Sequence, residues 1–315
     1  MGKTKFSVVI TCRNQENFIS DAVGSALAQS HAAREVIVVD DASTDGSVRI
    51  LKSYGNQIRL LVLESNQGVA AARDAGTALA QGEYVAYLDG DDALKLWALE
   101  LYDQIIQARS PVLILARLLF CGEQLPNNSD RELPPQIEFV SYENWIEKDR
   151  MFRPSASAVV VKGTALEEVG GWKGEVWPFE DYFLLAKLAY SGRTIQILQP
   201  STVLYRVHPL STSRNISLVL TGCHQYVEAM TAREQFKEKP KRLARLAMAG
   251  GAAQWMVRKL WTNGRKIEGL RLLFTTAPSI AAAAIMRLRA ILLGQRPTET
   301  LSLENALGQS VDIPS

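Results

Sequence analysis

The segment YVAYLDGDDAL, residues 84–94, joins an apolar run to a cluster of carboxylates. Residues 84–89 have the short, continuous apolar character of a strand that is buried in a sheet. Three acidic residues, Asp89, Asp91 and Asp92, lie within four positions at its end. Because like charges this close raise one another's pKa and repel, their place at the end of a buried strand predicts a site that uses them.

The same alternation of apolar strand and helix extends over the first 120 residues. We predict strands at 6–11, 35–40, 58–64 and 84–89, and helices at 16–30, 45–54, 68–81 and 93–108. Continuous apolar strands joined by helices are typical of a mostly parallel sheet that helices cover on both faces. The predicted fold class is therefore α/β.

The pattern changes after Pro111. In chain order we predict a strand at 111–120, a polar, Pro-rich loop at 122–136, a strand at 156–162, a short helix at 163–171, an amphipathic helix at 178–192 and short strands at 194–198 and 202–208. From about residue 216 the chain has the pattern of helices rich in Arg and Lys. The C-terminal part is therefore predicted to be a helical, basic extension.

Length and composition are those of one large globular domain, or of a domain with an extension. The chain has 315 residues, of which 47% are hydrophobic and 22% are charged, which is enough for a sizeable core. Its cysteines (Cys12, Cys121 and Cys223) have no metal-ligand spacing and no disulfide framework, which favours a reducing compartment. The apolar stretch 279–294 is too short to span a bilayer and is interrupted by arginines, so we predict no transmembrane helix.

Charge is distributed unevenly along the chain. Residues 233–296 contain 14 Lys and Arg against three Glu, whereas residues 1–232 carry a net charge of −6. The stretch 242–261 combines basic residues with Leu, Trp and Met at helical spacing. Such a segment either lies on an anionic membrane surface or packs as a helical bundle with a solvated basic face. No recognised nucleic-acid-binding motif accompanies the charge, which argues against nucleic acid as a partner.

Two acidic clusters follow predicted strands at their carboxyl ends. Asp40 and Asp41 follow the second strand, and residues 89–92 follow the fourth. Ligands of open α/β sheets bind at such strand ends, and crowded carboxylates are best stabilised there by Mg²⁺ or Mn²⁺ that carries substrate phosphates. Gly90 would let the backbone approach closely. The alternative is that these residues only cap helices and form solvated turns, and the usual phosphate loops, GxxxxGKS/T and GxGxxG, are missing.

Several motifs occur in the order found in one enzyme family. They are SVVITCRN (7–14), EVIVVDDASTDGS (35–47), NQGVAAARDAG (66–76), YLDGDD (87–92), VGGW (169–172), FEDYFLLAKLAYSG (179–192) and YRVHPLSTS (205–213). Over roughly residues 5–210 the chain resembles a family 2 glycosyltransferase of the GT-A fold, an inverting enzyme that uses a nucleotide-diphospho-sugar. The resemblance implies a Rossmann-like, mostly parallel sheet covered by helices. It also implies a catalytic domain at 1–215, with a nucleotide-binding half at 1–110 and an acceptor half at 111–215, then a helical basic extension at 216–300 and a tail at 301–315.

The resemblance implies roles for residues on the donor side. Thr11 and Arg13 lie where family members hold the base of the donor nucleotide. Asp41 matches the acid that hydrogen-bonds uracil, and Arg73 matches the basic residue beside the nucleotide. The first motif lacks the usual Pro and Tyr, and Asp74 stands where the family often has Asn, a charge that nothing in the sequence explains.

The resemblance also implies a metal site. Asp89-Gly90-Asp91 matches the DxD motif, in which Asp91 would ligate Mn²⁺ or Mg²⁺ on the diphosphate and Asp89 would face the ribose or the metal. His208 matches a position that in many members helps to hold metal or diphosphate.

On the acceptor side, Asp181 matches the catalytic base, and Glu180 would orient Asp181 or an acceptor hydroxyl. Taken alone, this acidic pair also fits the start of a helix, where carboxylates favour the dipole. Trp172 and Trp177 are interpreted either as acceptor-binding platforms for a sugar or as core aromatics.

Together these features predict an inverting glycosyltransferase that moves a sugar from a nucleotide-diphospho-sugar, with UDP favoured, to a hydroxyl of a glycan or lipid-linked acceptor. We expect a role in polysaccharide and cell-envelope biosynthesis, in the cytoplasm, with peripheral contact on the inner face of an anionic membrane as one interpretation of the basic extension. The alternatives are a scaffold that binds nucleotide-sugar without transfer, and a nucleotidyltransferase. The latter would want a basic, Gly-rich loop, which TCRNQENF (11–18) is not.

Overall fold

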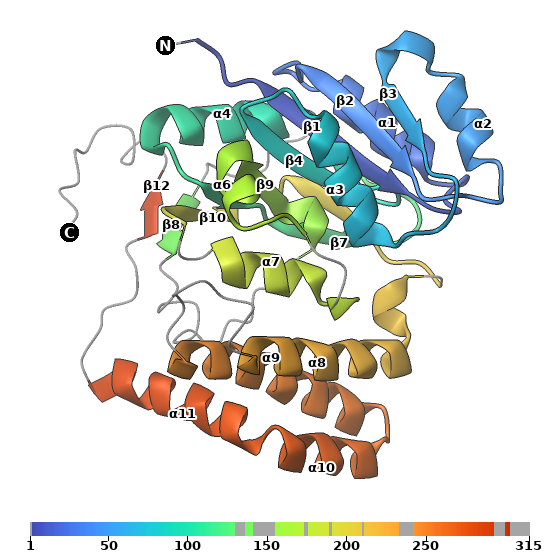
Figure 1. Ribbon diagram of the computed structural model, residues 1–315. Coiled ribbons are helices and arrows are strands. Elements are labelled where there is room, and N and C mark those ends of the chain that lie inside the picture. The colour runs from blue at the N-terminus through green and yellow to red at the C-terminus, as the bar shows by residue number, and fades with distance from the viewer. Residues whose placement is uncertain are drawn as a thin grey trace.

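The structure is a computed structural model. It describes residues 2–129, 136–140, 155–172, 176–188, 191–209, 211–232, 242–292 and 300–302. Figure 1 shows a large sheet with helices packed against it and a further layer of helices beneath. The predicted α/β class with a C-terminal helical extension is therefore confirmed.

Four parallel strands form the N-terminal half of the large sheet. They are β1 (Phe6–Cys12), β2 (Glu35–Asp40), β3 (Arg59–Val62) and β4 (Tyr84–Asp89). Their spatial order is β4-β1-β2-β3, and every neighbouring pair is parallel. All four lie at the predicted positions. The central strands β1, β2 and β4 are buried almost throughout, which is why their sequences are unbroken apolar runs.

The other strands of this sheet run in both directions. They are β6 (Leu113–Leu115), β8 (Gln136–Val140), β9 (Val159–Lys162), β10 (Thr194–Gln199) and β12 (Thr300–Ser302). β9 is antiparallel to β4 and β6, and β8 is antiparallel to β10 and β12. β6 and β10 pair parallel, and of the nine described strands of this sheet only β8 and β9 run against β1. The prediction of a mostly parallel sheet is therefore confirmed, although apolar runs do not reveal which strands enter in the opposite direction.

A second, three-stranded sheet has the order β5-β11-β7. Its strands are β5 (Ala93–Leu94), β7 (Leu118–Cys121) and β11 (Val203–Arg206). The predicted single strand at 111–120 is wrong, because the chain leaves the large sheet after β6 and Arg117 O accepts hydrogen bonds from the N–H groups of Thr202 and Val203. The predicted helix at 93–108 begins only at Ala98, because 93–94 pair with β11.

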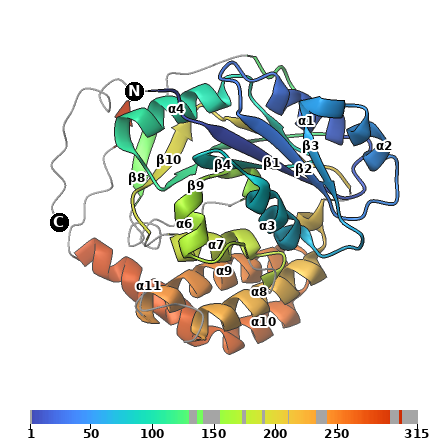
Figure 2. The same cartoon turned by 45° about the horizontal axis from the view of Figure 1, so that its top comes forward.

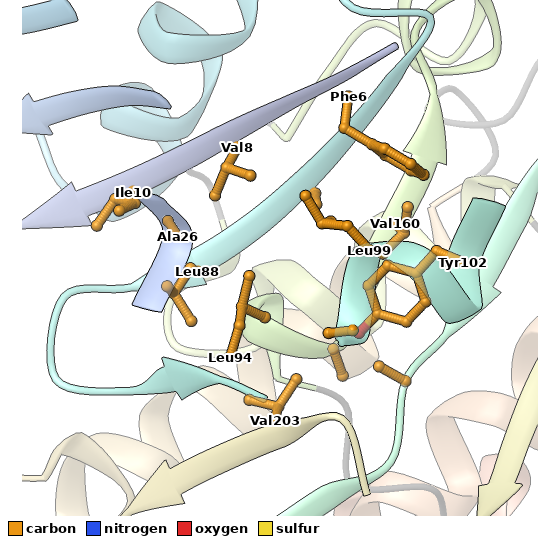
Figure 3. Close-up of a cluster of buried hydrophobic side chains, with 14 of the residues drawn as sticks. Phe6, Val8, Ile10, Ala26, Leu88, Leu94, Leu99, Tyr102, Val160 and Val203 are labelled. Carbon is orange, nitrogen blue, oxygen red and sulfur yellow. The ribbon is translucent and has the colours of Figure 1, made fainter. Parts of the chain in front are cut away.

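Helices cover both faces of the N-terminal sheet. The α-helices among the described residues up to 188 are α1 (Ile19–Leu27), α2 (Ser47–Lys52), α3 (Val69–Leu79), α4 (Ala98–Arg109), α6 (Gly163–Glu168) and α7 (Glu180–Leu188). Val8 and Ile10 of β1 pack in one cluster with α1 and α4, part of which is drawn in Figure 3. Val9, on the opposite face, packs in a second cluster with α3, α6 and α7. This period-two alternation along β1 divides the core into two layers.

The C-terminal extension packs beneath α7 (Figure 2). Its helices are α8 (Ile216–Thr231), α9 (Arg242–Thr262), α10 (Lys266–Thr275) and α11 (Ala277–Leu292). Phe179 directly precedes α7, and Phe183 lies within it. Both are buried in one cluster with Tyr226 of α8 and Met256 of α9. The bundle interpretation of the extension therefore applies to α8 and α9.

Several predicted segments fall partly outside the described residues. The loop predicted at 122–136 has no helix or strand over 122–129, and 130–135 are not described. Of the tail predicted at 301–315, only 301–302 are described, in β12, and the domain limits near 215 and 300 stay predictions.

Candidate active site

The carboxyl end of β1 is the place where the strand order reverses. β1 lies between β2, the next strand in the chain, and β4, so ligands of this class of sheet bind beside it. Thr11 is the register partner of Asp89, and Thr11 Oγ1 lies 3.5 Å from Asp89 Oδ1. The N–H of Gly90 donates to Thr11 O over 2.9 Å, and a Cβ at Gly90 would press on Gln15 and on this oxygen. The close approach predicted for Gly90 is therefore made to β1 and its loop.

The loop after β1 is hydrogen-bonded to the loop after β2. Asn14 Oδ1 accepts from Thr44 N over 2.7 Å, and Glu16 Oε2 accepts from Gly46 N over 2.7 Å. Asn14 has a φ of 52°, in the left-handed region that Asn tolerates. Arg13 is exposed next to these contacts. The loop that carries Arg13 is therefore fixed by side chains, while its guanidinium remains at the surface.

The two acids after β2 bind backbone N–H groups. Asp41 is buried, and its carboxylate accepts from Gln67 N over 2.7 Å and from Gly68 N over 2.9 Å. Asp40 Oδ1 accepts from Ser43 N over 2.8 Å. Both acids thus stabilise turns, as the alternative interpretation expected, and Asp41 fixes the loop that leads into α3. Its contact with uracil stays a prediction.

Arg73 on α3 joins residues from the two halves of the sequence. Its Nη2 lies 2.7 Å from Asp89 Oδ1, and its Nη1 lies 2.8 Å from Glu180 Oε1. The guanidinium is buried, and its Cζ lies 4.6 Å from the ring centroid of Trp172. Burial lowers the pKa of Arg73, but the charges of Asp89 and Glu180 outweigh it, so the net shift is upward. The acidic cluster at residues 89–92 and the acidic pair on α7 therefore meet at one cation, the guanidinium of Arg73.

Trp172 is a core aromatic, which corrects its assignment to acceptor binding. Its exposed fraction is 0%, and its ring meets Tyr87 edge-on with a centroid distance of 4.7 Å. One of its neighbours is the Arg73 guanidinium, so its role is to support that side chain. Trp177 is 41% exposed and precedes α7, so its role at an acceptor site stays a prediction.

Asp91 and Asp92 point to different partners. Asp91 Oδ2 lies 2.9 Å from His208 Nε2, and the His208 ring contacts Phe18 at a centroid distance of 4.7 Å. Asp92 is 1% exposed and accepts from Ser157 Oγ over 2.6 Å. Burial, followed by the charges of Asp91 and Asp89, raises the pKa of Asp92 well above its ordinary value. Asp91 is therefore the partly exposed acid of this turn, with the buried His208 as its partner, and Asp92 is buried and held by Ser157.

Arg206 is a site residue that sequence reasoning missed, although it stands inside the motif YRVH (205–208). Its Nε donates to Asp91 O over 2.7 Å, and its Nη2 donates to Asp21 Oδ2 over 2.6 Å. A further donor reaches Glu123 O, and the guanidinium lies over the Phe18 ring at 4.7 Å. Arg206 therefore fixes the backbone of the DxD turn.

The acidic pair on α7 lies at the first turn of the helix. Asp181 is half-buried, and its Oδ1 accepts from Tyr182 N over 2.7 Å. Burial, and then the charge of Glu180, raise the pKa of Asp181 well above its ordinary value. Glu180 Oε2 is buried and has no hydrogen-bond partner among the described residues. Of the two acids, Glu180 is held by Arg73, and Asp181 is held by the backbone N–H of Tyr182.

Tyr205 lies near acids from both halves of the sequence. Burial raises the pKa of its hydroxyl, and the charges of four carboxylates raise it further: Asp92, Asp89, Asp91 and Asp181. Such an effect requires that all four lie near the same phenol. The acids of residues 89–92 and Asp181 therefore lie near the same side chain, while their roles in a reaction stay predictions.

Asp74 gains a structural explanation. Its Oδ1 accepts from Trp172 N over 2.8 Å, and a Cβ at Gly171, which has a φ of 73°, would lie 2.5 Å from the same oxygen. From the other side, Lys187 Nζ donates to Val169 O over 3.2 Å and also to Gly171 O. The turn 169–172 is thus clamped between α3, which carries Arg73, and α7, which carries Asp181.

The described residues contain no group of three or more His, Cys, Asp and Glu side chains that could hold a metal ion. Asp91 and His208 supply one carboxylate and one imidazole at hydrogen-bond distance. The carboxylate suits Mn²⁺ and Mg²⁺, whereas the imidazole favours a transition metal such as Mn²⁺ over Mg²⁺. Mg²⁺ is commonly held by one or two carboxylates together with substrate phosphates. The donor set fits a metal that arrives with a diphosphate.

Comparison with known proteins gives the same family as the motifs. The pattern that defines "Glycosyl transferase family 2" matches residues 7–162. The glycosyltransferase TuaG of Bacillus subtilis is 42% identical over 111 residues, which are 34% of this chain and 44% of that protein. The succinoglycan biosynthesis protein ExoO of Rhizobium meliloti is 27% identical over 240 residues, 72% of this chain and 66% of that protein. The chain thus spans less than two thirds of the length of these relatives.

Among solved structures, Staphylococcus aureus TarS in complex with UDP-GlcNAc is similar to this chain with a TM-score of 0.61. The match covers 92% of each chain at 18% identity, so it shows the fold alone. The family pattern, the ordered motifs and this fold agree. Residues 7–162 of the chain are a glycosyltransferase family 2 domain, and the chain has the GT-A fold.

Proposed function

We propose that this protein is an inverting glycosyltransferase. The observation that carries the proposal is the double ion pair of Arg73 with Asp89 and Glu180, which brings the DxD turn and the acidic pair of α7 to one site. The site lies at the carboxyl end of β1, where the strand order reverses. Two carboxylate groups with different partners at one crevice suit a reaction that needs a phosphate site and a base.

The proposed donor is a nucleotide-diphospho-sugar, with UDP as the favoured nucleotide. TarS, which has a similar fold, is known in complex with UDP-GlcNAc and with UDP. In this chain the base would lie between Thr11, Arg13 and Asp41, along the rim that the loops after β1 and β2 form. Arg73 and Asp89 would lie beside the ribose and diphosphate.

Asp91 and His208 would hold Mn²⁺ or Mg²⁺ together with the donor diphosphate. Bound there, the ion would act as a Lewis acid that stabilises negative charge on the leaving diphosphate. Arg206 holds the backbone of Asp91, so the carboxylate is already placed for this task.

Asp181 is proposed as the general base. The acceptor hydroxyl attacks the anomeric carbon from the face opposite the diphosphate, its proton passes to the Asp181 carboxylate, and the nucleoside diphosphate leaves with the bonding electrons. This displacement inverts the anomeric configuration. The raised pKa of Asp181 makes its carboxylate a stronger base than a solvated one. Glu180, held by Arg73, would orient Asp181 or the acceptor.

The proposed acceptor is a hydroxyl of a glycan or lipid-linked glycan, with Trp177 as a stacking surface beside α7. The relatives TuaG and ExoO are glycan biosynthesis proteins, and TarS is named as a poly(ribitol-phosphate) β-N-acetylglucosaminyltransferase. By analogy we place this chain in cell-envelope polysaccharide synthesis, in the cytoplasm, with its basic extension in peripheral contact with an anionic membrane.

The test is product formation from a panel of UDP- and other nucleotide-sugars with soluble and lipid-linked acceptors, followed by mass spectrometry. We expect a glycosylated product and free nucleoside diphosphate, in a reaction that depends on Asp181. Binding of donor with no product from any acceptor would favour a scaffold. Release of pyrophosphate from a nucleoside triphosphate and a sugar phosphate would show nucleotidyl transfer instead.

A further inference from the structure

The outer face of α10 and α11 exposes large apolar side chains. Phe274 is 77% exposed, Ile267 is 70% exposed and Ile285 is 55% exposed. We call this set the α10–α11 face; its large apolar members are Ile267, Leu270, Phe274, Ile285 and Leu288. Isolated exposed apolar residues are common, but five on adjoining helices mark a contact surface.

The face is set by helical spacing. Ile267, Leu270 and Phe274 are three and four residues apart and lie on one side of α10. The opposite side carries Gly269 and Leu272, which are buried. Gly269 packs on Trp261, and any Cβ there would collide with its indole. The inner side of α10 is therefore used for folding, and the outer apolar side chains serve no packing within the described chain.

Like α10, α11 has a buried inner side and an exposed outer side. Its Ala282 and Ala283 are buried against Ala244 and Ala247 of α9. Ser279 lies so close to α9 that a Cβ at Gly250 would overlap the backbone of Ser279. The large side chains Ile285 and Leu288 point away from this close contact and are exposed. α11 is thus anchored by small residues, and its larger apolar residues face outward.

The surroundings of the face are strongly basic. Residues 242–292 contain nine Lys and Arg and one acid, Glu268. Glu268 is itself paired with Arg265. Lys266 and Arg271 are exposed directly beside Ile267 and Leu270. A surface of this composition has a high affinity for an apolar layer that is bordered by negative charge.

We propose that the α10–α11 face lies in the interface of an anionic lipid bilayer, with its apolar side chains at the headgroup–acyl boundary and its basic residues on the lipid headgroups. No described helix is by itself long and apolar enough to cross a membrane, whereas α10 and residues 277–286 together meet that length and composition test across a bend of 73°. A bent, apolar and basic pair on the outside of a fold fits a surface position. α10 and α11 form the outermost layer, away from the large sheet (Figures 1 and 2).

A second copy of this chain is a poorer occupant of the face. In a symmetric dimer the same patch meets itself, so Lys266, Arg271 and their neighbours would face an identical positive surface. Anionic lipid supplies the opposite charge as well as the apolar layer. The charge pattern therefore selects a membrane over self-association.

The inference specifies the membrane contact of the proposed function but does not depend on glycosyl transfer. It is tested with the full chain, without donor or acceptor, by co-sedimentation with phosphatidylcholine vesicles that contain or lack phosphatidylglycerol. We expect binding to the anionic vesicles, weaker binding at high salt, and at least about tenfold weaker binding of the Ile267→Ser/Phe274→Ser variant, because each buried side chain contributes apolar transfer energy. Phe120→Ser is the matched control, since Phe120 is 51% exposed on β7; it should bind as the wild type does.

A charge variant, Lys266→Glu/Arg271→Glu, should also bind anionic vesicles at least about tenfold less tightly, with an unchanged melting temperature. The proposal is overturned if the Ile267→Ser/Phe274→Ser variant binds as tightly as the wild type. It is also overturned if the wild type binds no vesicles but forms a dimer in gel filtration that this variant dissociates. Either result leaves the transfer assay unaffected, so failure of the membrane proposal and failure of the proposed reaction are distinguishable.

Discussion

Asp89, at the end of β4, and Glu180, at the start of α7, bind the same guanidinium, that of Arg73, at 2.7 Å and 2.8 Å. This arrangement joins the N-terminal sheet to the helix that carries Asp181. The guanidinium is buried, and water has little access to the two acids beside it. Arg73 is therefore the main positive charge that balances Asp89 and Glu180. The Arg73 side chain therefore links the helix of the proposed base directly to the turn at 89–91.

Arg73→Ala is expected to destabilise the fold by about 3–5 kcal/mol, because it leaves two partly buried carboxylates facing each other without a cation. Arg73→Lys should lose less stability, since an ammonium keeps the charge but lacks the two planar donors. Urea unfolding at neutral pH measures both. Arg59→Ala, on the exposed strand β3, is the control and should cost less than about 1 kcal/mol. Equal losses for Arg73→Ala and Arg59→Ala would contradict a central role for the ion pairs.

Asp181→Asn is expected to lower kcat by about 10²–10⁴-fold, the usual contribution of a general base. Donor binding should persist, because Asp181 faces the acceptor side in the proposed reaction. Steady-state kinetics and donor titration calorimetry measure the two effects separately. Glu168→Gln, on the exposed surface of α6, serves as the control and should retain full activity. A variant that loses donor affinity but keeps kcat would assign Asp181 to donor binding instead.

The raised pKa of Asp181 predicts how stability depends on pH. Its carboxyl holds a proton more tightly in the folded than in the unfolded chain, so between the unfolded and the folded pKa the folded state binds more protons. Stability then falls as pH rises through this window. Asp181→Asn lacks this loss, so its melting temperature should exceed that of the wild type near neutral pH, and the difference should shrink in acid. Parallel melting profiles of the two proteins would contradict the shift.

The apolar runs were sufficient to predict β1, β2 and β4, because the burial of these strands requires continuous apolar sequence. β3 also lies at its predicted position, although it is exposed or only partly buried. The strand end also placed Asp89 and Asp91 correctly at the reversal of strand order. The same runs could not separate β6 from β7, since Leu115 and Leu118 are equally apolar and only their partners differ. Pairing between distant strands is a long-range property, which a local pattern does not contain.

Within the site, residue type predicted the charged groups better than the aromatic ones. A carboxylate at the end of a strand is rarely part of an apolar core, so its residue type indicates a polar site. A tryptophan fits a binding surface and an apolar core equally well, and Trp172 lies in the core. Arg206 escaped notice because its partners, Asp21 and the backbone of Asp91, are distant in sequence. Asp74 was noticed as unusual, but its partner is a backbone N–H, which no sequence pattern marks.

Asp74→Ala is expected to reduce kcat by loosening the turn 169–172, because the N–H of Trp172 then loses its acceptor. Loss of one such buried bond costs about 1–3 kcal/mol of stability. Asp74→Asn keeps a side-chain oxygen at this place and should restore most of the activity. This rescue distinguishes a hydrogen-bonding role from a charge effect on the donor, which Asn would not restore. Kinetics and thermal melting of the two variants decide between them.

The pair of Asp91 and His208 predicts where a divalent ion binds. Mn²⁺ is expected to bind more tightly when UDP is present, because two protein donors leave the remaining coordination positions to diphosphate oxygens. Asp91→Asn and His208→Gln should each weaken that binding by about tenfold or more. Loss of a residue that only supports a metal ligand already lowers metal affinity by at least about tenfold, and loss of the ligand itself should lower it further. Electron paramagnetic resonance of free Mn²⁺ during titration reports binding without any reaction. His224→Gln, on the exposed side of α8, is the matched control and should change nothing. Unchanged Mn²⁺ binding in both site variants would mean that the ion, if it binds, uses other residues, and the proposed role of the DxD turn would then be wrong.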